Sequence, residues 1–135
     1  MIKLYLLILA GALSCSSLAL TSDLNGQWKV TKRVCANDQP ARDDYGAAST
    51  NLVIHGDQVT MNALFISSGM KLPVQVHGRV YDRAMVFQSD EGYGAAVVDY
   101  DFDFDKGVLL LESKITSPED RSCPFGMKLF TYYGR

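Results

Sequence analysis

The sequence lacks a surplus of positive charge, and this excludes one broad class of function. Lysine and arginine number 13 and aspartate and glutamate 15, for a net charge of -2, with both signs scattered along the chain. Proteins that bind nucleic acids need a basic surplus on one face of the fold. We therefore expect no nucleic-acid partner.

The sequence also lacks the motifs typical of catalytic and metal sites. It contains no Gly-x-Ser-x-Gly, no glycine-rich phosphate loop and no pair of carboxylates that stands apart from the other surface acids. The histidines His55 and His77 have no ligand partner at close spacing, and we expect both in solvent. These absences predict a protein that is not an enzyme and holds no metal or cofactor.

One acidic stretch approaches the spacing of a calcium loop. Acids fall at positions 1, 3, 5 and 12 of the pattern that begins at Asp101 and ends at Glu112. The pattern requires glycine at position 6, where this chain has Lys106, and Gly107 comes one residue late. The flanking residues alternate as strands do, so we interpret the stretch as an outward acidic stripe that leads into a hairpin turn.

Long apolar runs are absent beyond the N-terminus. Lys3 precedes an apolar run at residues 4–13, and small residues follow at 14–19, which is the pattern of a secretory signal peptide. The run is shorter than the roughly 20 residues that span a bilayer. We predict a signal peptide at residues 1–19 and a mature domain at residues 20–135. The protein is then periplasmic or secreted and has no transmembrane span.

Cys15 leaves a second fate for the N-terminus open. Residues 12–15 approximate the lipobox of bacterial lipoproteins, although that pattern prefers leucine where Ala12 stands. We favour export followed by cleavage after Ala19 and keep lipid attachment at Cys15 as the alternative. In either case Cys15 does not belong to the folded domain.

Cysteine is scarce, which simplifies its interpretation. Once the N-terminal segment is set aside, only Cys35 and Cys123 remain. An even pair in an oxidising compartment usually forms a disulfide. A bridge that closes so much of the domain is worth roughly 4–5 kcal/mol in the chain-entropy model.

A helical period is missing from the mature chain, and short stretches of alternating apolar and polar residues take its place. Turn residues separate these stretches, and the short spacing favours antiparallel neighbours. We predict an all-β fold, a single eight-stranded antiparallel up-and-down barrel with one disulfide, and keep a sandwich as the alternative. The expected strands are residues 27–35, 51–54, 59–66, 70–80, 84–88, 95–104, 108–115 and 125–133.

The first predicted strand shows the alternation most clearly. Trp28, Val30 and Val34 fall on the inward face, whereas Arg33 is expected outside. Lys32 falls in the inward phase, which a bulge or a position at the barrel mouth explains; contact with a ligand is the less favoured alternative. The polar stretch at residues 36–49 follows as the longest predicted loop, and loops of that length often carry function.

The predicted disulfide fits a closed barrel. The first and last strands of an up-and-down barrel pair antiparallel. Cys35 ends the first predicted strand and Cys123 comes just before the last. We therefore expect both cysteines at one rim, and Trp28 and the C-terminal residues toward the other.

The first strand resembles the start of lipocalins. Gly26-Gln27-Trp28 matches the Gly-x-Trp signature of that family, and Arg135 lies where an arginine of the last strand covers the tryptophan. The resemblance implies an exported protein that binds a small apolar molecule or lipid inside its barrel, below the loop at residues 36–49. The candidate cavity-lining residues are Val30, Met61, Phe65, Val76, Tyr100 and Phe102.

A second resemblance rests on nearly the same residues. Residues 24–28 followed by Cys35 are similar to the start of the periplasmic inhibitors of serralysin-type metalloproteases, which are also small barrels with one disulfide. In that family the second cysteine lies mid-chain, whereas Cys123 lies near the C-terminus. This resemblance implies an exported protein partner, a filled barrel, and an N-terminal segment, here residues 20–24, that enters a protease cleft.

Overall fold

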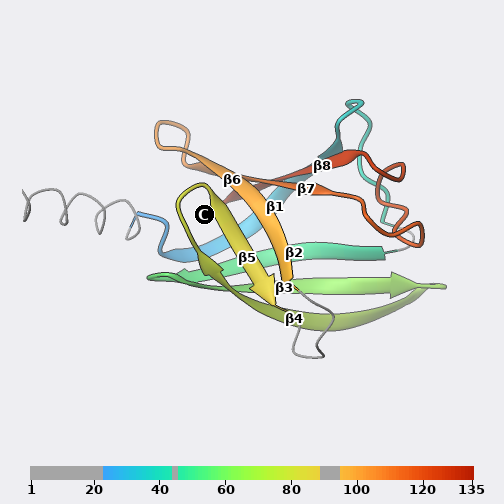
Figure 1. Cartoon of the computed structure of the whole chain (residues 1–135), viewed down its shortest axis with the longest axis horizontal. Helices are drawn as coiled ribbons and strands as arrows, with labels where there is room; N and C mark the ends of the chain where they lie inside the picture. Colours follow the sequence, from blue (N-terminus) through green and yellow to red (C-terminus); the bar gives the residue numbers. More distant parts are fainter. Residues whose placement is uncertain (1–22, 44–45, 89–94) are drawn as a thin grey trace, which may run out of the picture.

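The computed structural model describes residues 23–43, 46–88 and 95–135 (Figure 1). The predicted signal peptide at residues 1–19, its cleavage site after Ala19 and the alternative lipidation site Cys15 lie outside the described residues. In the part of the chain that is described, no helix is long and apolar enough to cross a membrane.

Eight strands in sequence order form one closed barrel (Figure 1). Each strand pairs antiparallel with the next, and β8 pairs antiparallel with β1 to close the sheet. This confirms the predicted all-β, eight-stranded antiparallel barrel. The strands are β1 (Gly26–Cys35), β2 (Gly46–His55), β3 (Gln58–Ser67), β4 (Met70–Val80), β5 (Ala84–Gln88), β6 (Ala95–Asp103), β7 (Val108–Lys114) and β8 (Lys128–Gly134).

The strand bounds differ from the prediction mainly at β2 and β8. β2 begins at Gly46, so the predicted loop at residues 36–49 is shorter and its last residues pair with β3. Small and polar residues fill the start of β2, and without large apolar side chains no alternation is visible there. β8 begins at Lys128, because the residues before it form a turn in which the Met127 N–H donates to the Pro124 carbonyl.

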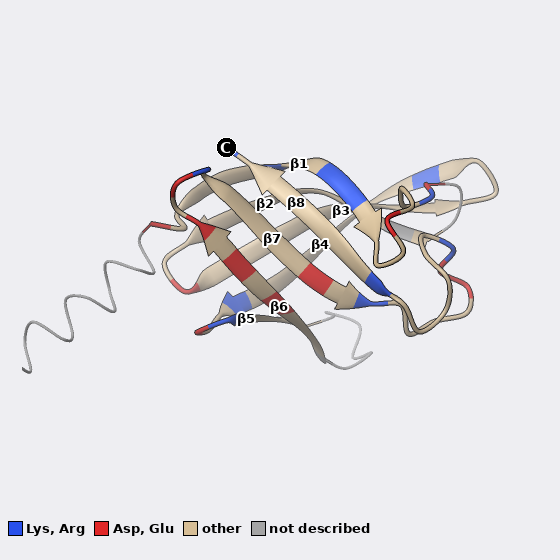
Figure 2. Ribbon diagram, turned by 90° about the horizontal axis from the view of Figure 1, so that it is seen from above, with Lys and Arg blue, Asp and Glu red and all other residues tan. Residues whose placement is uncertain are grey.

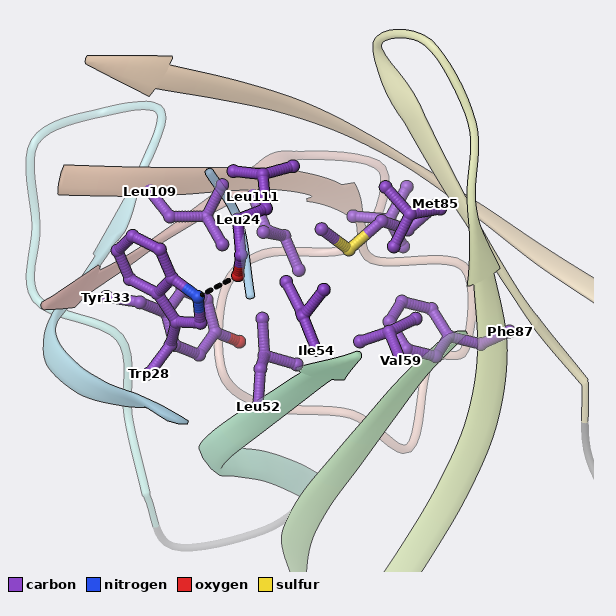
Figure 3. Packing of buried hydrophobic residues seen from close by; sticks show 12 residues of the cluster. Leu24, Trp28, Leu52, Ile54, Val59, Met85, Phe87, Leu109, Leu111 and Tyr133 are labelled. Atoms are coloured by element: carbon purple, nitrogen blue, oxygen red, sulfur yellow. Dashed lines mark hydrogen bonds between the residues drawn. The ribbon is translucent and has the colours of Figure 1, made fainter. Parts of the chain in front are cut away.

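The main core surrounds Trp28. This side chain is fully buried, and its indole Nε1 donates a hydrogen bond of 2.8 Å to the Leu24 carbonyl (Figure 3). Each large apolar side chain that is buried contributes roughly 1.5–3 kcal/mol, so this cluster is a major source of stability. Its buried members are Leu24, Trp28, Leu52, Ile54, Val59, Val80, Met85, Phe87, Val98, Leu109, Leu111 and Tyr133.

Arg135 covers Trp28 at one end of the barrel. Its guanidinium carbon lies 4.2 Å from the centroid of the indole, a favourable cation–π distance, and the guanidinium donates a hydrogen bond to the Asp23 carbonyl. Gly26 adopts a φ of 131°, which favours glycine because it has no side chain. Gly26, Trp28 and Arg135 thus show the arrangement that the lipocalin resemblance implies.

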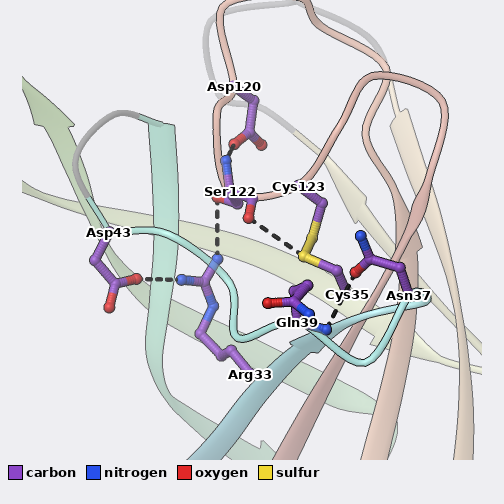
Figure 4. Close-up of a disulfide and its surroundings, with 8 residues drawn as sticks. All are labelled: Arg33, Cys35, Asn37, Gln39, Asp43, Asp120, Ser122 and Cys123. Atoms are coloured by element: carbon purple, nitrogen blue, oxygen red, sulfur yellow. Dashed lines mark hydrogen bonds and ion pairs between the residues drawn. A yellow bond between two sulfur atoms is a disulfide. The ribbon is translucent and has the colours of Figure 1, made fainter.

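The predicted disulfide joins Cys35 and Cys123, whose Cα atoms are 5.7 Å apart. Figure 4 shows the bridge and its surroundings. Cys35 ends β1 and pairs with Leu129 of β8, so the bridge lies at the rim of the barrel opposite Trp28. Both half-cystines are buried and form a second small cluster with Ile115 and Leu129. The prediction of a disulfide between these two residues is therefore confirmed.

The acidic stretch that approaches a calcium loop is a strand followed by a hairpin turn. Asp101 and Asp103 of β6 are exposed. Acidic residues recur along this strand (Figure 2). The Asp103 carboxylate accepts hydrogen bonds from the backbone N–H groups of Asp105 and Lys106, which fixes the turn. Within the described ranges, no three His, Cys, Asp or Glu side chains gather as a metal site would require. Both histidines are exposed.

Candidate functional site

A cavity of about 300 Å³ lies inside the barrel, between the main core and the disulfide rim. Side chains from all eight strands contribute to its wall, which is mostly apolar. Ligand pockets in proteins typically measure roughly 300–1,000 Å³ and combine an apolar wall with a few polar groups. The apolar wall includes Met61, Ala63, Val76, Phe87, Val98 and Leu111.

The six candidate cavity residues fall into three groups. Met61 and Val76 line the cavity. Val30, Tyr100 and Phe102 pack against the main core, as Met61 and Val76 also do, but do not line the cavity. The centroid of the Phe102 ring lies 5.6 Å from that of the Trp28 ring in an edge-on contact. The remaining candidate, Phe65, lies outside the cavity wall and is 39% exposed. The cavity therefore occupies a narrower zone of the barrel than the candidates span.

A separate hollow of about 370 Å³ lies on the outer wall of the barrel. Its polar lining includes Gln58, Thr60, His77 and Arg79. Gln58 and Thr60 flank Val59, whose side chain is buried inside the barrel, so their own side chains point outward. Arg79 and His77 pair with these two residues and point the same way, so the hollow lies outside the barrel. It shares no lining residue with the internal cavity.

Arg33 enters the cavity because of a β-bulge in β1. Val30 pairs with Tyr133 and Lys32 with Tyr132, so Thr31 is an extra residue without a partner of its own on β8. A bulge of this kind changes the direction in which the following side chains point. After it, Arg33 pairs with the buried Thr131 and lines the cavity. The hydroxyl of Thr31 donates a hydrogen bond of 3.2 Å to the Tyr132 carbonyl.

A second bulge in β2 places another polar group in the cavity wall. Ser49 pairs with Ala63 and Asn51 with Asn62, so Thr50 is the extra residue. Its hydroxyl donates a hydrogen bond of 3.0 Å to the Asn62 carbonyl, in the same way as the threonine of the first bulge. Ser49 consequently faces inward beside Ala63. Two threonine bulges on neighbouring strands thus bring an arginine and a serine into an apolar interior.

Tyr133 connects these polar groups. Its hydroxyl donates a hydrogen bond of 2.8 Å to Ser49 Oγ, and both residues line the cavity. Burial raises the pKa of Tyr133 to about 12, while the bond to Ser49 and the positive charge of Arg33 act in the opposite direction. The Tyr133 hydroxyl is therefore neutral at physiological pH, and it lies close enough to the Arg33 guanidinium to interact with its charge.

The guanidinium of Arg33 forms an ion pair with Asp43 at 2.5 Å and donates a hydrogen bond of 3.3 Å to Ser122 Oγ (Figure 4). Asp43 reaches this position because the chain folds back along β1 after Cys35. In this return the Ala41 N–H donates to the Arg33 carbonyl at 3.1 Å. The two partners differ in burial, since the Arg33 side chain is 9% exposed and that of Asp43 is 67% exposed.

The prediction that Arg33 faces outward is therefore wrong, and the bulge at Thr31 is the reason. Strict alternation from Trp28 places Lys32 and Val34 inside, but the extra residue exchanges the two faces of the second half of the strand. The inward phase of Lys32 was the signal of a bulge, which the structure confirms. The position of the bulge, and so the inward direction of Arg33, was not visible in the sequence.

An apolar strip continues from the cavity wall onto the hairpin of β3 and β4. This hairpin forms the right end of the molecule in Figures 1 and 2. On β4, every second residue back from the cavity residue Val76 is apolar and lies on the same face, namely Val74, Leu72 and Met70. On β3, Phe65 pairs with Leu72. All four residues beyond the cavity are exposed. Among the described residues, β4 pairs with β5 only from His77 onward, which leaves this part of the strip uncovered on that side.

The cavity combines a mostly apolar wall with a few charged and hydroxyl-bearing side chains, among them Arg33, Ser49 and Tyr133, which is a combination suited to binding. No model of a known protein family matches the sequence, and comparison with curated proteins gives no match either. The interpretation of the site therefore rests on its geometry and on the barrel fold.

Proposed function

We propose that this chain is an exported, lipocalin-like, non-enzymatic protein that carries a small apolar molecule or lipid in its barrel. The observation that carries the proposal is the internal cavity of about 300 Å³ with a mostly apolar wall. An apolar wall favours an apolar ligand, because binding removes apolar surface of both partners from water. The disulfide supports export, since such bridges persist in oxidising compartments.

The exposed apolar strip supports the same function. It adds the side chains of Phe65, Leu72 and Met70 to the wall on one side of the cavity. An apolar ligand that is longer than the cavity gains a surface for the part that extends beyond it. Contiguous exposed apolar surface of this kind often marks a binding site.

The alternative function is that of a protease inhibitor or another protein-binding barrel. It requires a filled interior and an N-terminal segment that a partner can reach. Leu24 is 4% exposed and accepts the hydrogen bond from the Trp28 indole, so this residue of the segment is part of the core. Residues 20–22 lie outside the described residues. Together with the cavity, the burial of Leu24 favours the small-ligand function.

The function is tested by native mass spectrometry of the protein purified from the periplasm of its host, together with titration by the neutral dye Nile red. We expect a co-purified lipid mass and saturable dye fluorescence. Ala63→Phe fills the cavity and should weaken dye binding at least tenfold, whereas the outward-facing Val53→Phe should not. A clean apo mass together with no saturable dye binding contradicts the proposal.

A further inference from the structure

Arg33 places a positive charge where an apolar ligand alone would not require one. A guanidinium is costly to bury unless another charge and hydrogen bonds compensate it. Asp43 is one compensating charge, and its side chain is itself mostly exposed. Arg33 is thus a buried cation on the cavity wall, and Asp43 is an exposed carboxylate. If Asp43 separates from Arg33, water can solvate its charge.

Two hydroxyl groups share the cavity wall with this cation. Tyr133 Oη and Ser49 Oγ are hydrogen-bonded to each other, and both residues line the cavity with Arg33. The wall also includes Lys114 and Asp120, whose carboxylate accepts a hydrogen bond from the Ser122 N–H. When Asp43 is released from Arg33, the wall has two cations, Arg33 and the exposed Lys114, and one carboxylate, Asp120. This balance favours a ligand with a negative head group.

We propose that the ligand is a single-chain carboxylic acid whose carboxylate pairs with Arg33 in place of Asp43, while its chain lies along the apolar wall. The inference rests on the proposed function and specifies the head group of its ligand. Asp43 already places a carboxylate oxygen on Arg33 Nη1, so this guanidinium is positioned to donate to a carboxylate. The planar fork of arginine can also bind both oxygens of such a group. Asp43 then competes with the ligand, and its exposure makes its release inexpensive.

The experiment compares dodecanoate with dodecanol, two ligands of the same chain length that differ in the head group. Each displaces Nile red from the purified mature protein at neutral pH. We expect dodecanoate to bind about tenfold more tightly than dodecanol, as a hydrogen-bonded charge pair provides. Equal affinities, or tighter binding of the alcohol, overturn the inference but leave the proposed function intact. If neither compound nor dye binds, the proposed function fails, and the inference fails with it.

Two variants test the roles of the paired residues. Arg33→Met keeps the length of the side chain and should abolish the preference for the acid while leaving dodecanol affinity within about twofold. Asp43→Asn removes the competitor and should tighten dodecanoate binding several-fold with no effect on dodecanol. The control is Arg79→Met, which removes an exposed arginine from the outer wall and should preserve the preference.

The direction of the Asp43→Asn effect separates competition from positioning. If Asp43 only holds Arg33 in place, its loss weakens dodecanoate binding, and that result overturns the proposed replacement. A retained acid preference in a folded Arg33→Met protein equally overturns it. Where Arg33→Met does not fold, the wild-type comparison of acid with alcohol and the Asp43→Asn variant still give a decisive outcome.

Discussion

At Tyr133, burial changes the pH at which a hydroxyl ionises. The side chain is 1% exposed, and burial raises its pKa to about 12, against about 10 for an exposed tyrosine. The unfolded chain therefore loses this proton at a lower pH than the folded protein does. Tyr133 accordingly contributes its full stability below about pH 10 and loses it as the pH rises toward 12.

The alkaline loss can be measured against a variant without the hydroxyl. We predict that wild-type protein loses about 2 kcal/mol of unfolding free energy between pH 10 and pH 12 beyond what Tyr133→Phe loses. Urea unfolding at a series of alkaline pH values gives both curves. Parallel curves for the two proteins would show that Tyr133 does not remain protonated in the fold.

Two arginines at opposite ends of the barrel illustrate how a partner defines a role. Arg135 lies over the fully buried Trp28 and donates to the carbonyl of Asp23. These contacts join the C-terminus to the core and to the residues before β1. Arg33 pairs instead with the exposed carboxylate of Asp43. A solvated carboxylate is easily exchanged for another, whereas a buried indole is not. The first arginine therefore suits a structural role and the second a binding role.

At the scale of the strand, the bulge in β1 predicts which deletion the barrel tolerates. Thr31 is an extra residue, so its removal leaves Trp28 and Arg33 facing inward and converts the ladder with β8 to a regular one. Deletion of Leu110 from β7, which pairs regularly on both sides, instead turns half of that strand inside out.

We predict that the protein lacking Thr31 folds, forms its disulfide and loses only about 1 kcal/mol, the order of the lost hydrogen bond. The protein lacking Leu110 should not fold. Titration of unreacted thiols and urea unfolding distinguish the two. Equal damage from both deletions would contradict the assignment of Thr31 as the extra residue.

The strands and the disulfide could be predicted from the sequence, whereas the positions of the β-bulges could not. Alternation of apolar and polar residues identified all eight strands, and the position of Cys123 before the last strand located the bridge. The bulges left almost no trace, because a threonine is equally ordinary as a paired or as an extra residue of a strand. Since one extra residue exchanges the two faces, the direction of Arg33 and Ser49 had to come from the register itself.

On the scale of the whole molecule, the barrel has a packed half and a hollow half. The half around Trp28 is filled by the main apolar cluster. The other half contains the cavity, and its rim is formed by the bridge of Cys35 and Cys123 and by the loops on either side. At this rim, Gly46 lies so close to Asp120 that an added Cβ would sit 2.4 Å from its carboxylate oxygen. A hollow half buries less apolar surface, so it depends more on covalent and close backbone contacts for its order.

The disulfide should consequently contribute a large share of the stability of the whole domain. It joins residues 88 positions apart, and closing a loop of that length reduces the entropy of the unfolded chain by an amount worth roughly 4–5 kcal/mol. We predict a loss of that size in the double variant Cys35→Ala, Cys123→Ala, measured by guanidinium unfolding. Wild-type protein treated with a reductant serves as the control and should show a similar loss. Unchanged thermal stability after removal of the bridge would contradict this account, because the packed half alone would then hold the barrel closed.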